Sequence, residues 1–202
     1  MEQFDKYEAV IGLEVHAQLS TISKIFAADA TEYGAAPNTQ VSVITAALPG
    51  TLPKINKGVV EKAIMLGLAC NCTINQYNTF DRKNYFYPDS PKGFQTTQDN
   101  FPICLGGSVT IEVDDVSTEI ALNRIHLEED AGKTNHELLE DFSLVDLNRA
   151  GTPLVEIVTE PVLKNSDEAY SFLTEIRKLV RYLNICDGNM EEGSLRCDAN
   201  VS

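Results

Sequence analysis

The first regular pattern in the chain is a strict alternation of apolar and polar residues between positions 7 and 19. Apolar side chains occupy every second position from Ile11 to Leu19, and Glu14 and His16 fall on the positions between them. Side chains two residues apart on a strand point to the same face of the sheet. The pattern therefore predicts a β-strand with one buried face, and it places Glu14 and His16 side by side on the other face.

Two later stretches have the spacing of helices. In the first, apolar residues recur every three or four positions after Asn56, a favourable N-cap residue, and the helix should end near Asn71. The second stretch is Ser166–Leu183, where Asn165 is the N-cap and Glu168 completes a capping box. Its continuous apolar stripe makes it the clearest predicted helix of the chain.

Short β-rich runs account for most of the remaining chain. Alternation predicts a hairpin over residues 109–124 with its turn at Asp114–Asp115, and further strands over residues 143–148 and 153–159. Residues 80–98 are rich in proline and aromatic side chains and predict a long loop. The order of these elements predicts an α+β domain, with a mainly antiparallel sheet and helices packed on one side.

Composition narrows the functional classes. Of the 202 residues, 43% are hydrophobic, and 30 Asp and Glu against 16 Lys and Arg give a formal net charge of −14. That charge is the opposite of what a free-standing nucleic-acid-binding module carries. No apolar run is long enough to cross a membrane and no leader is recognisable, so we expect a cytoplasmic protein. The five irregularly spaced cysteines predict free thiols.

The negative charge is concentrated in one segment, because residues 112–146 hold 11 acids and 2 bases. Such a run is usually a solvated face, and carboxylates gathered around a cation are the alternative. Three short clusters favour the second interpretation: the Glu14–His16 pair, the acids of residues 128–130, and the pair Glu191 and Glu192. Together they fit two or more divalent cations that hold a polyphosphate. A structural Glu–His pair and a water-screened strand end remain open alternatives.

Several known catalytic signatures are absent from the sequence. Gly132-Lys133-Thr134 resembles the end of a phosphate-binding loop, but Leu127 occupies the position of the required earlier glycine. The tandem serines of an amidase are missing, and the cysteines lack the spacing of a zinc ribbon. The adjacent cations Arg82 and Lys83 are suited to bind phosphate or carboxylate groups of a ligand. The alternative is that this aromatic segment simply packs on itself.

Five motifs in order resemble the B subunit of the aspartyl/glutamyl-tRNA amidotransferase, and they cover the chain from about residue 7 to its end: Val10–Leu19, Phe80–Asp89, His126–Lys133, Ser143–Leu154 and Met190–Asn200. The resemblance implies a catalytic domain with a glutamine-synthetase-like fold, often called the cradle domain. It also implies that residues 1–202 are this domain, truncated at its C-terminal end and without the helical and tail domains of the family.

The resemblance further implies a ligase that uses ATP and Mg²⁺. In that family the side-chain carboxylate of a misacylated Glu-tRNA(Gln) or Asp-tRNA(Asn) is phosphorylated, and ammonia from an amidase then gives the amide. A carboxylate is a poor electrophile until it is phosphorylated, and phosphoryl transfer relies on cations, which agrees with the clusters above. The implied partners in a heterotrimer are the amidase, which is the A subunit, and the small C subunit, with tRNA held by domains absent from this chain.

Site residues follow from the resemblance and from their chemistry. The resemblance makes four residues metal ligands and adds Glu191 or Glu192 to them: Glu14, His16, Glu128 and Glu129. Chemistry assigns Lys83 and Arg196 to phosphate or substrate carboxylate, and four other side chains are further candidates for contacts with ATP: Arg82, Tyr85, Arg149 and Ser194. Two other functions remain open on the same acids, a metal-dependent phosphoesterase and a non-catalytic acidic scaffold that docks a partner chain.

Overall fold

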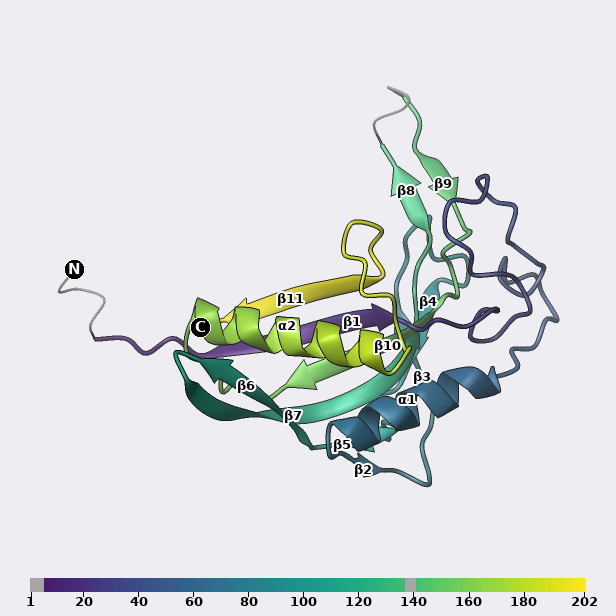
Figure 1. Cartoon of the computed structure of the whole chain (residues 1–202). Helices are drawn as coiled ribbons and strands as arrows, with labels where there is room; N and C mark the ends of the chain where they lie inside the picture. Colours follow the sequence, from purple (N-terminus) through teal and green to yellow (C-terminus); the bar gives the residue numbers. More distant parts are fainter. Residues whose placement is uncertain (1–5, 137–140) are drawn as a thin grey trace.

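The computed structural model describes residues 6–136 and 141–202. Its centre is an antiparallel sheet in the order β11-β1-β10-β7-β5-β2, with β6 paired to β7 (Figure 1). The strands of this sheet are β1 (Ile11–Gln18), β2 (Thr73–Ile74), β5 (Cys104–Leu105), β6 (Ser108–Val113), β7 (Val116–Glu129), β10 (Pro153–Thr159) and β11 (Leu195–Val201). The predicted α+β class is confirmed, and the glutamine-synthetase-like fold stays a prediction.

Two helices cover the same face of the sheet, α1 (Lys57–Ala69) and α2 (Ser166–Tyr182). The core joins apolar side chains of α1 and α2 to the odd-numbered positions of β1 and β10, and on β7 to Ile120, Leu122, Ile125 and Leu127. Burial of apolar surface at these positions is the main force that holds the helices on the sheet. The even-numbered positions of β1, of β10 and of residues 124–128 of β7 therefore form a helix-free face, and most of the charged and imidazole side chains of these segments lie there.

Helix starts follow the predicted caps. The side chain of Asn56 accepts a hydrogen bond from Gly58 N, and Asn165 Oδ1 accepts one from Glu168 N at 2.8 Å. Glu168 returns the bond by accepting from the backbone N of Lys164. These bonds satisfy backbone donors that have no partner inside a helix.

The predicted loop over residues 80–98 is wrong in part. This segment contains a hairpin of its own, in which β3 (Asp81–Asn84) pairs with β4 (Phe94–Thr97). Its strands show no apolar alternation. No residue of β3 is buried, and on β4 only Thr97 is buried. A third small hairpin joins β8 (Lys133–Asn135) to β9 (Leu144–Asp146), a strand shorter than the predicted run over residues 143–148.

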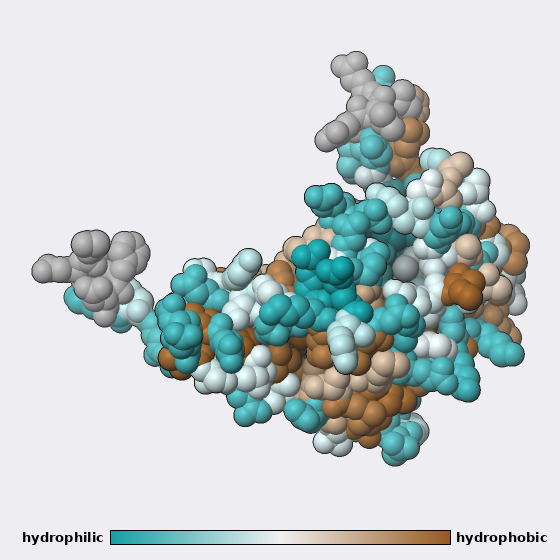
Figure 2. All heavy atoms as spheres, viewed as in Figure 1, coloured by the Kyte–Doolittle hydropathy of each residue, from teal (hydrophilic) through white to brown (hydrophobic). Residues whose placement is uncertain are grey.

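Other sequence predictions are confirmed. The turn of the β6–β7 hairpin lies at Asp114–Asp115, both with positive φ, which aspartate tolerates better than most residues. All five cysteines are free, and four of them are buried. Within the described ranges, no helix is long and apolar enough to cross a membrane. Figure 2 shows that apolar surface gathers over α1, where Met65 and Leu68 are exposed, on the helix-covered side of the molecule.

Candidate functional site

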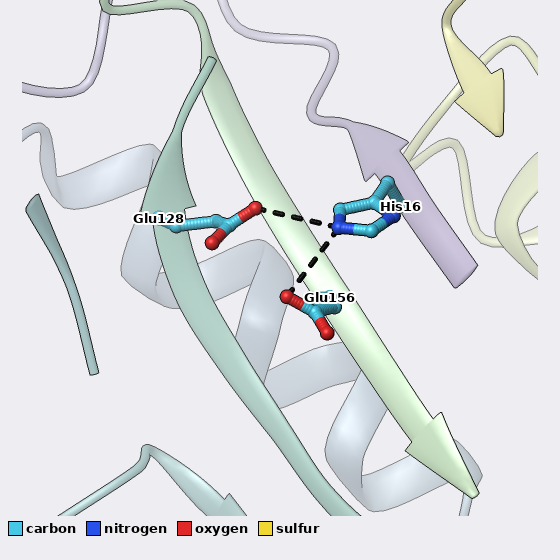
Figure 3. A group of neighbouring side chains, drawn as sticks. All are labelled: His16, Glu128 and Glu156. Atoms are coloured by element: carbon cyan, nitrogen blue, oxygen red, sulfur yellow. Dashed lines mark ion pairs between the residues drawn. The ribbon is translucent and has the colours of Figure 1, made fainter. Parts of the chain in front are cut away.

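Three neighbouring strands bring potential metal ligands together on the helix-free face (Figure 3). His16 of β1 lies opposite Glu156 of β10, and Glu128 comes from β7 on the other side of β10. His16 Nε2 is 3.4 Å from Glu156 Oε2 and 3.6 Å from Glu128 Oε1. One donor atom from each residue lies within 4.8 Å of the others. Register alone thus converts three distant sequence positions into a donor set.

A second imidazole supports this cluster. His126 of β7 is buried, and its Nε2 lies 3.2 Å from Glu156 Oε2. Its Nδ1 accepts a hydrogen bond from Arg124 Nε at 3.3 Å, which leaves Nε2 to carry the proton toward the carboxylate. A carboxylate that is held in this way keeps its orientation for a ligand on its other side.

Burial and charge act in opposite directions on these groups. Burial by itself lowers the pKa of His16, but the hydrogen bond to Glu156 and the charges of Glu156 and Glu128 outweigh burial, so that its pKa is raised. Burial by itself raises the pKa of Glu156, but hydrogen bonds from His126 and His16 hold it well below its usual range. Both carboxylates are largely withdrawn from solvent, so the cluster favours a bound positive charge.

The donor set fits a divalent cation. Two carboxylate oxygens and one imidazole nitrogen are ligands that Mn²⁺ and Zn²⁺ accept readily, whereas Mg²⁺ prefers oxygen ligands and keeps several waters. Of the predicted metal ligands, His16 and Glu128 belong to this set. Glu14 lies on the same face and lines the cavity that contains the donor set, but its Oε1 accepts a hydrogen bond from Asn200.

The remaining predicted metal ligands have other surroundings. Glu129 forms an ion pair with Lys92 and accepts a hydrogen bond from Thr96 N, so a cation of the protein already neutralises it. Glu191 and Glu192 belong to the loop before β11, and neither lines the cavity that holds the donor set. Glu192 instead lines a smaller cavity of about 360 Å³. The structure therefore does not bring this pair to the cluster.

The donor set lies in a cavity of about 890 Å³ between the helix-free face and the β3–β4 hairpin. Four predicted ligand-binding residues line it: Arg82, Lys83, Tyr85 and Arg196. Lys83 and Arg82 are exposed on β3, and the Arg82 guanidinium lies 4.6 Å from the ring centre of Phe94. Tyr85 stacks on Tyr87 at 4.8 Å. One cavity thus combines carboxylates at its floor with cations and aromatic rings at its edge.

Arg149 and Ser194 have structural partners instead. Arg149 donates to the backbone oxygens of Ala131 and Gly132, and Ser194 Oγ donates to Asp187 at 3.3 Å. Both line the smaller cavity, not the larger one. These two predicted nucleotide-binding residues therefore line a different cavity from the donor set.

Sequence reasoning missed Glu156 and His126. The sequence signal for Glu156 was a single acid inside the apolar run of β10, at a position less buried than its two neighbours. His126 and Glu128 are two residues apart on β7 and share a face, but the sequence did not show that both would face Glu156. The order of strands in the sheet was needed to connect them.

Comparison with known proteins shows the family to which the chain belongs. Residues 9–202 match the model of the GatB/GatE catalytic domain. Proteins named as the B subunit of aspartyl/glutamyl-tRNA(Asn/Gln) amidotransferase are similar over 98% of this chain: the protein of Desulfotalea psychrophila is 57% identical, that of Thiobacillus denitrificans 58% and that of Synechococcus sp. 53%. The chain spans 41 to 42% of the length of these relatives. Because the match covers nearly the whole chain, the chain belongs to the GatB/GatE catalytic domain family.

Proposed function

We propose that this domain activates the side-chain carboxylate of a misacylated tRNA with ATP, as part of an aspartyl/glutamyl-tRNA amidotransferase. The observation that carries the proposal is the set formed by His16, Glu128 and Glu156 in one cavity with Lys83 and Arg196. Carboxylates that can hold a cation, beside fixed positive side chains, are what phosphoryl transfer requires. The relatives named as parts of an amidotransferase supply the substrate class.

The balanced reaction has two steps. A substrate carboxylate oxygen attacks the γ-phosphorus of ATP, so that an acyl phosphate forms and ADP leaves. Ammonia then attacks the acyl carbon, inorganic phosphate departs with the bonding electrons, and the nitrogen loses a proton to give the amide. The chain needs no nucleophile of its own for either step, which is consistent with the absence of an amidase serine motif.

The residues of this chain would divide the work by charge. His16, Glu128 and Glu156 would hold a divalent cation, which would neutralise phosphate charge when it is bound. Lys83 and Arg82 on the hairpin, together with Arg196, present fixed cations to phosphate oxygens or to the substrate carboxylate. The ring of Tyr85, which stacks on Tyr87, offers an apolar surface at the edge of the same cavity.

Ammonia would come from an amidase, the A subunit, with a small C subunit completing a cytoplasmic heterotrimer. The acidity of the chain agrees with this division, because a net charge of −14 repels the tRNA backbone. The surfaces that hold tRNA would then lie outside these 202 residues. Ammonia release from glutamine would likewise occur on another chain.

The decisive test replaces Glu156 by glutamine in an amidotransferase whose B subunit carries this sequence. The amide keeps the shape but loses the negative charge that a cation needs, so we expect ATP-dependent amidation to fall at least about 100-fold. Amide formation and ADP release with misacylated tRNA measure the effect. Glu160→Gln is the matched control, since Glu160 bonds to Asn123 beyond the end of β10 and away from the cavity.

A second measurement does not depend on activity. Mn²⁺ should raise the melting temperature of the unmodified protein and leave that of Glu156→Gln nearly unchanged, because only a native-state ligand stabilises by mass action. Equal amidation by Glu156→Gln and the unmodified enzyme would contradict the metal assignment. Hydrolysis of a simple phosphodiester without ATP would instead support the phosphoesterase.

A further inference from the structure

The carboxylate of Asp130 lies directly after β7, is 6% exposed and has several partners. Its Oδ2 accepts hydrogen bonds from Arg196 Nη2 at 3.0 Å and from Gln18 Nε2 at 2.8 Å. Its Oδ1 accepts from Ala131 N at 3.1 Å and lies 3.8 Å from Arg149 Nε. Both oxygens of this acid are therefore engaged by donors of the protein itself.

Arg196 depends on this acid for its position. It comes from β11, where it lies opposite His16, and its side chain is 38% exposed in the larger cavity. Among the residues that the structure describes, Asp130 is the only carboxylate in ion-pair distance of Arg196. The Arg196 Nε is buried without a hydrogen-bond partner in the protein. The direction of the Arg196 side chain is therefore set by its ion pair with Asp130, which engages only Nη2.

Asp130 is in turn held from two sides that do not include Arg196. Gln18 reaches it from β1, and Arg149 reaches it from the chain after β9, where its guanidinium also holds the carbonyls of Ala131 and Gly132. The carboxylate would therefore keep its place if Arg196 were removed. Its influence on the cavity then passes through the guanidinium, because its oxygens are already occupied by protein donors.

We propose that Asp130 is the positioning residue of Arg196: it fixes Nη2 and thereby the direction in which the guanidinium presents its charge to an anionic oxygen of the substrate. The inference rests on the proposed function, since it takes Arg196 as the group that contacts phosphate or the substrate carboxylate. Asp130 also lines the cavity, but its two oxygens are engaged by protein donors. An arginine held in this way loses less rotamer freedom when the anion binds, which favours the reacting geometry.

A double-mutant cycle separates positioning from general support. In the amidotransferase whose B subunit carries this sequence, we expect Asp130→Asn to lower single-turnover amidation about 10-fold and Arg196→Ala to lower it further. Asp130→Asn should cause no additional loss in the Arg196→Ala background, because there is then no guanidinium to position. An acid that only supports the fold would reduce the rate by the same factor in both backgrounds, and that result would overturn the inference.

Two further variants cover a failure of Asp130→Asn to fold. Gln18→Leu removes one of the side chains that hold Asp130, and we expect a smaller loss that again disappears in the Arg196→Ala background. Glu160→Gln, a carboxylate outside the cavity, is the control and should leave the rate unchanged. If Arg196→Ala amidates at the normal rate, the assignment of Arg196 in the proposed function fails. If Arg196→Ala is impaired but the losses multiply, only the positioning inference fails.

Discussion

Glu156 is contacted from both sides by imidazoles, His16 on β1 and His126 on β7. The two rings have different surroundings, because His126 is buried and held by Arg124, while His16 faces the cavity. One imidazole is therefore suited to orient the carboxylate and the other to bind beside it. This division of tasks could not be read from the sequence, where Glu156 appears only as a lone acid in an apolar run.

Lys24 is a buried cation beside the same cavity, with 1% of its surface exposed. Its Nζ donates to the backbone oxygens of Gln40 at 2.8 Å and Leu147 at 3.4 Å. Burial lowers its pKa to about 8, and the charges of Asp29 and Asp146 only partly oppose that shift. Two neutral acceptors replace the water that an ammonium loses, but they do not neutralise it.

The lowered pKa of Lys24 predicts a pH dependence of stability. Below pH 8 the folded and unfolded chains both hold the proton, and the buried charge destabilises the fold. Between about pH 8 and 10.5 the folded chain has released the proton while the unfolded chain still holds it, so the contribution of Lys24 to stability rises with pH.

The Lys24→Met variant isolates this effect, because the other titrating groups are common to both proteins. From pH 7 to pH 10 the unmodified protein should gain on the order of 2 kcal/mol in free energy of unfolding relative to the variant. Urea denaturation across that range measures it. Parallel pH curves for the two proteins would contradict the expectation.

At the level of elements, local signals predicted what local interactions decide. Alternation in β1 and β10, the caps at Asn56 and Asn165, and the β6–β7 turn all appear in the structure. The β3–β4 hairpin was missed because its strands are mostly exposed and leave no apolar pattern. The donor set was predicted only in part, since which strands become neighbours depends on long-range pairing that no local pattern specifies.

The start of α2 gives a prediction about a single element. Asn165→Ala removes the acceptor for the Glu168 backbone N, so the free energy of unfolding should fall by about 1 kcal/mol. Lys178→Ala is the control, because this exposed mid-helix residue makes only a surface pair with Glu175. Chemical denaturation compares the two variants. Equal stability of Asn165→Ala and the unmodified protein would show that the cap contributes nothing.

At the level of the whole molecule, the sheet separates two surfaces with different tasks. The odd-numbered positions of β1, of β10 and of residues 124–128 of β7 pack against the helices, and His16, Glu128 and Glu156, which line the cavity, come from the other face of these strands. Part of the net negative charge therefore belongs to a cavity floor suited to cations, not to the outer surface. The net negative charge therefore relates to cation binding in the cavity more than to repulsion of nucleic acid.

The overall charge also predicts how the isolated chain behaves toward tRNA. With a net charge of −14, the 202-residue chain should bind tRNA weakly, and the small remaining affinity should vary little with salt. Filter binding or fluorescence anisotropy at several KCl concentrations measures both quantities. A tight complex that weakens steeply with salt would place the tRNA-binding surface on this domain.

The antiparallel ladder of β1, β10 and β7 sets the spacing of the donor atoms as well as the packing of the core. A slip of one residue in β10 would turn Glu156 toward the helices and Val155 toward the cavity, so core and donor set would be lost together. A cation held by the three strands would therefore stabilise only correctly aligned chains. Mn²⁺ binding would thus indicate that the central strands are correctly aligned. The rate at which a refolding chain binds Mn²⁺ would measure how fast these strands align.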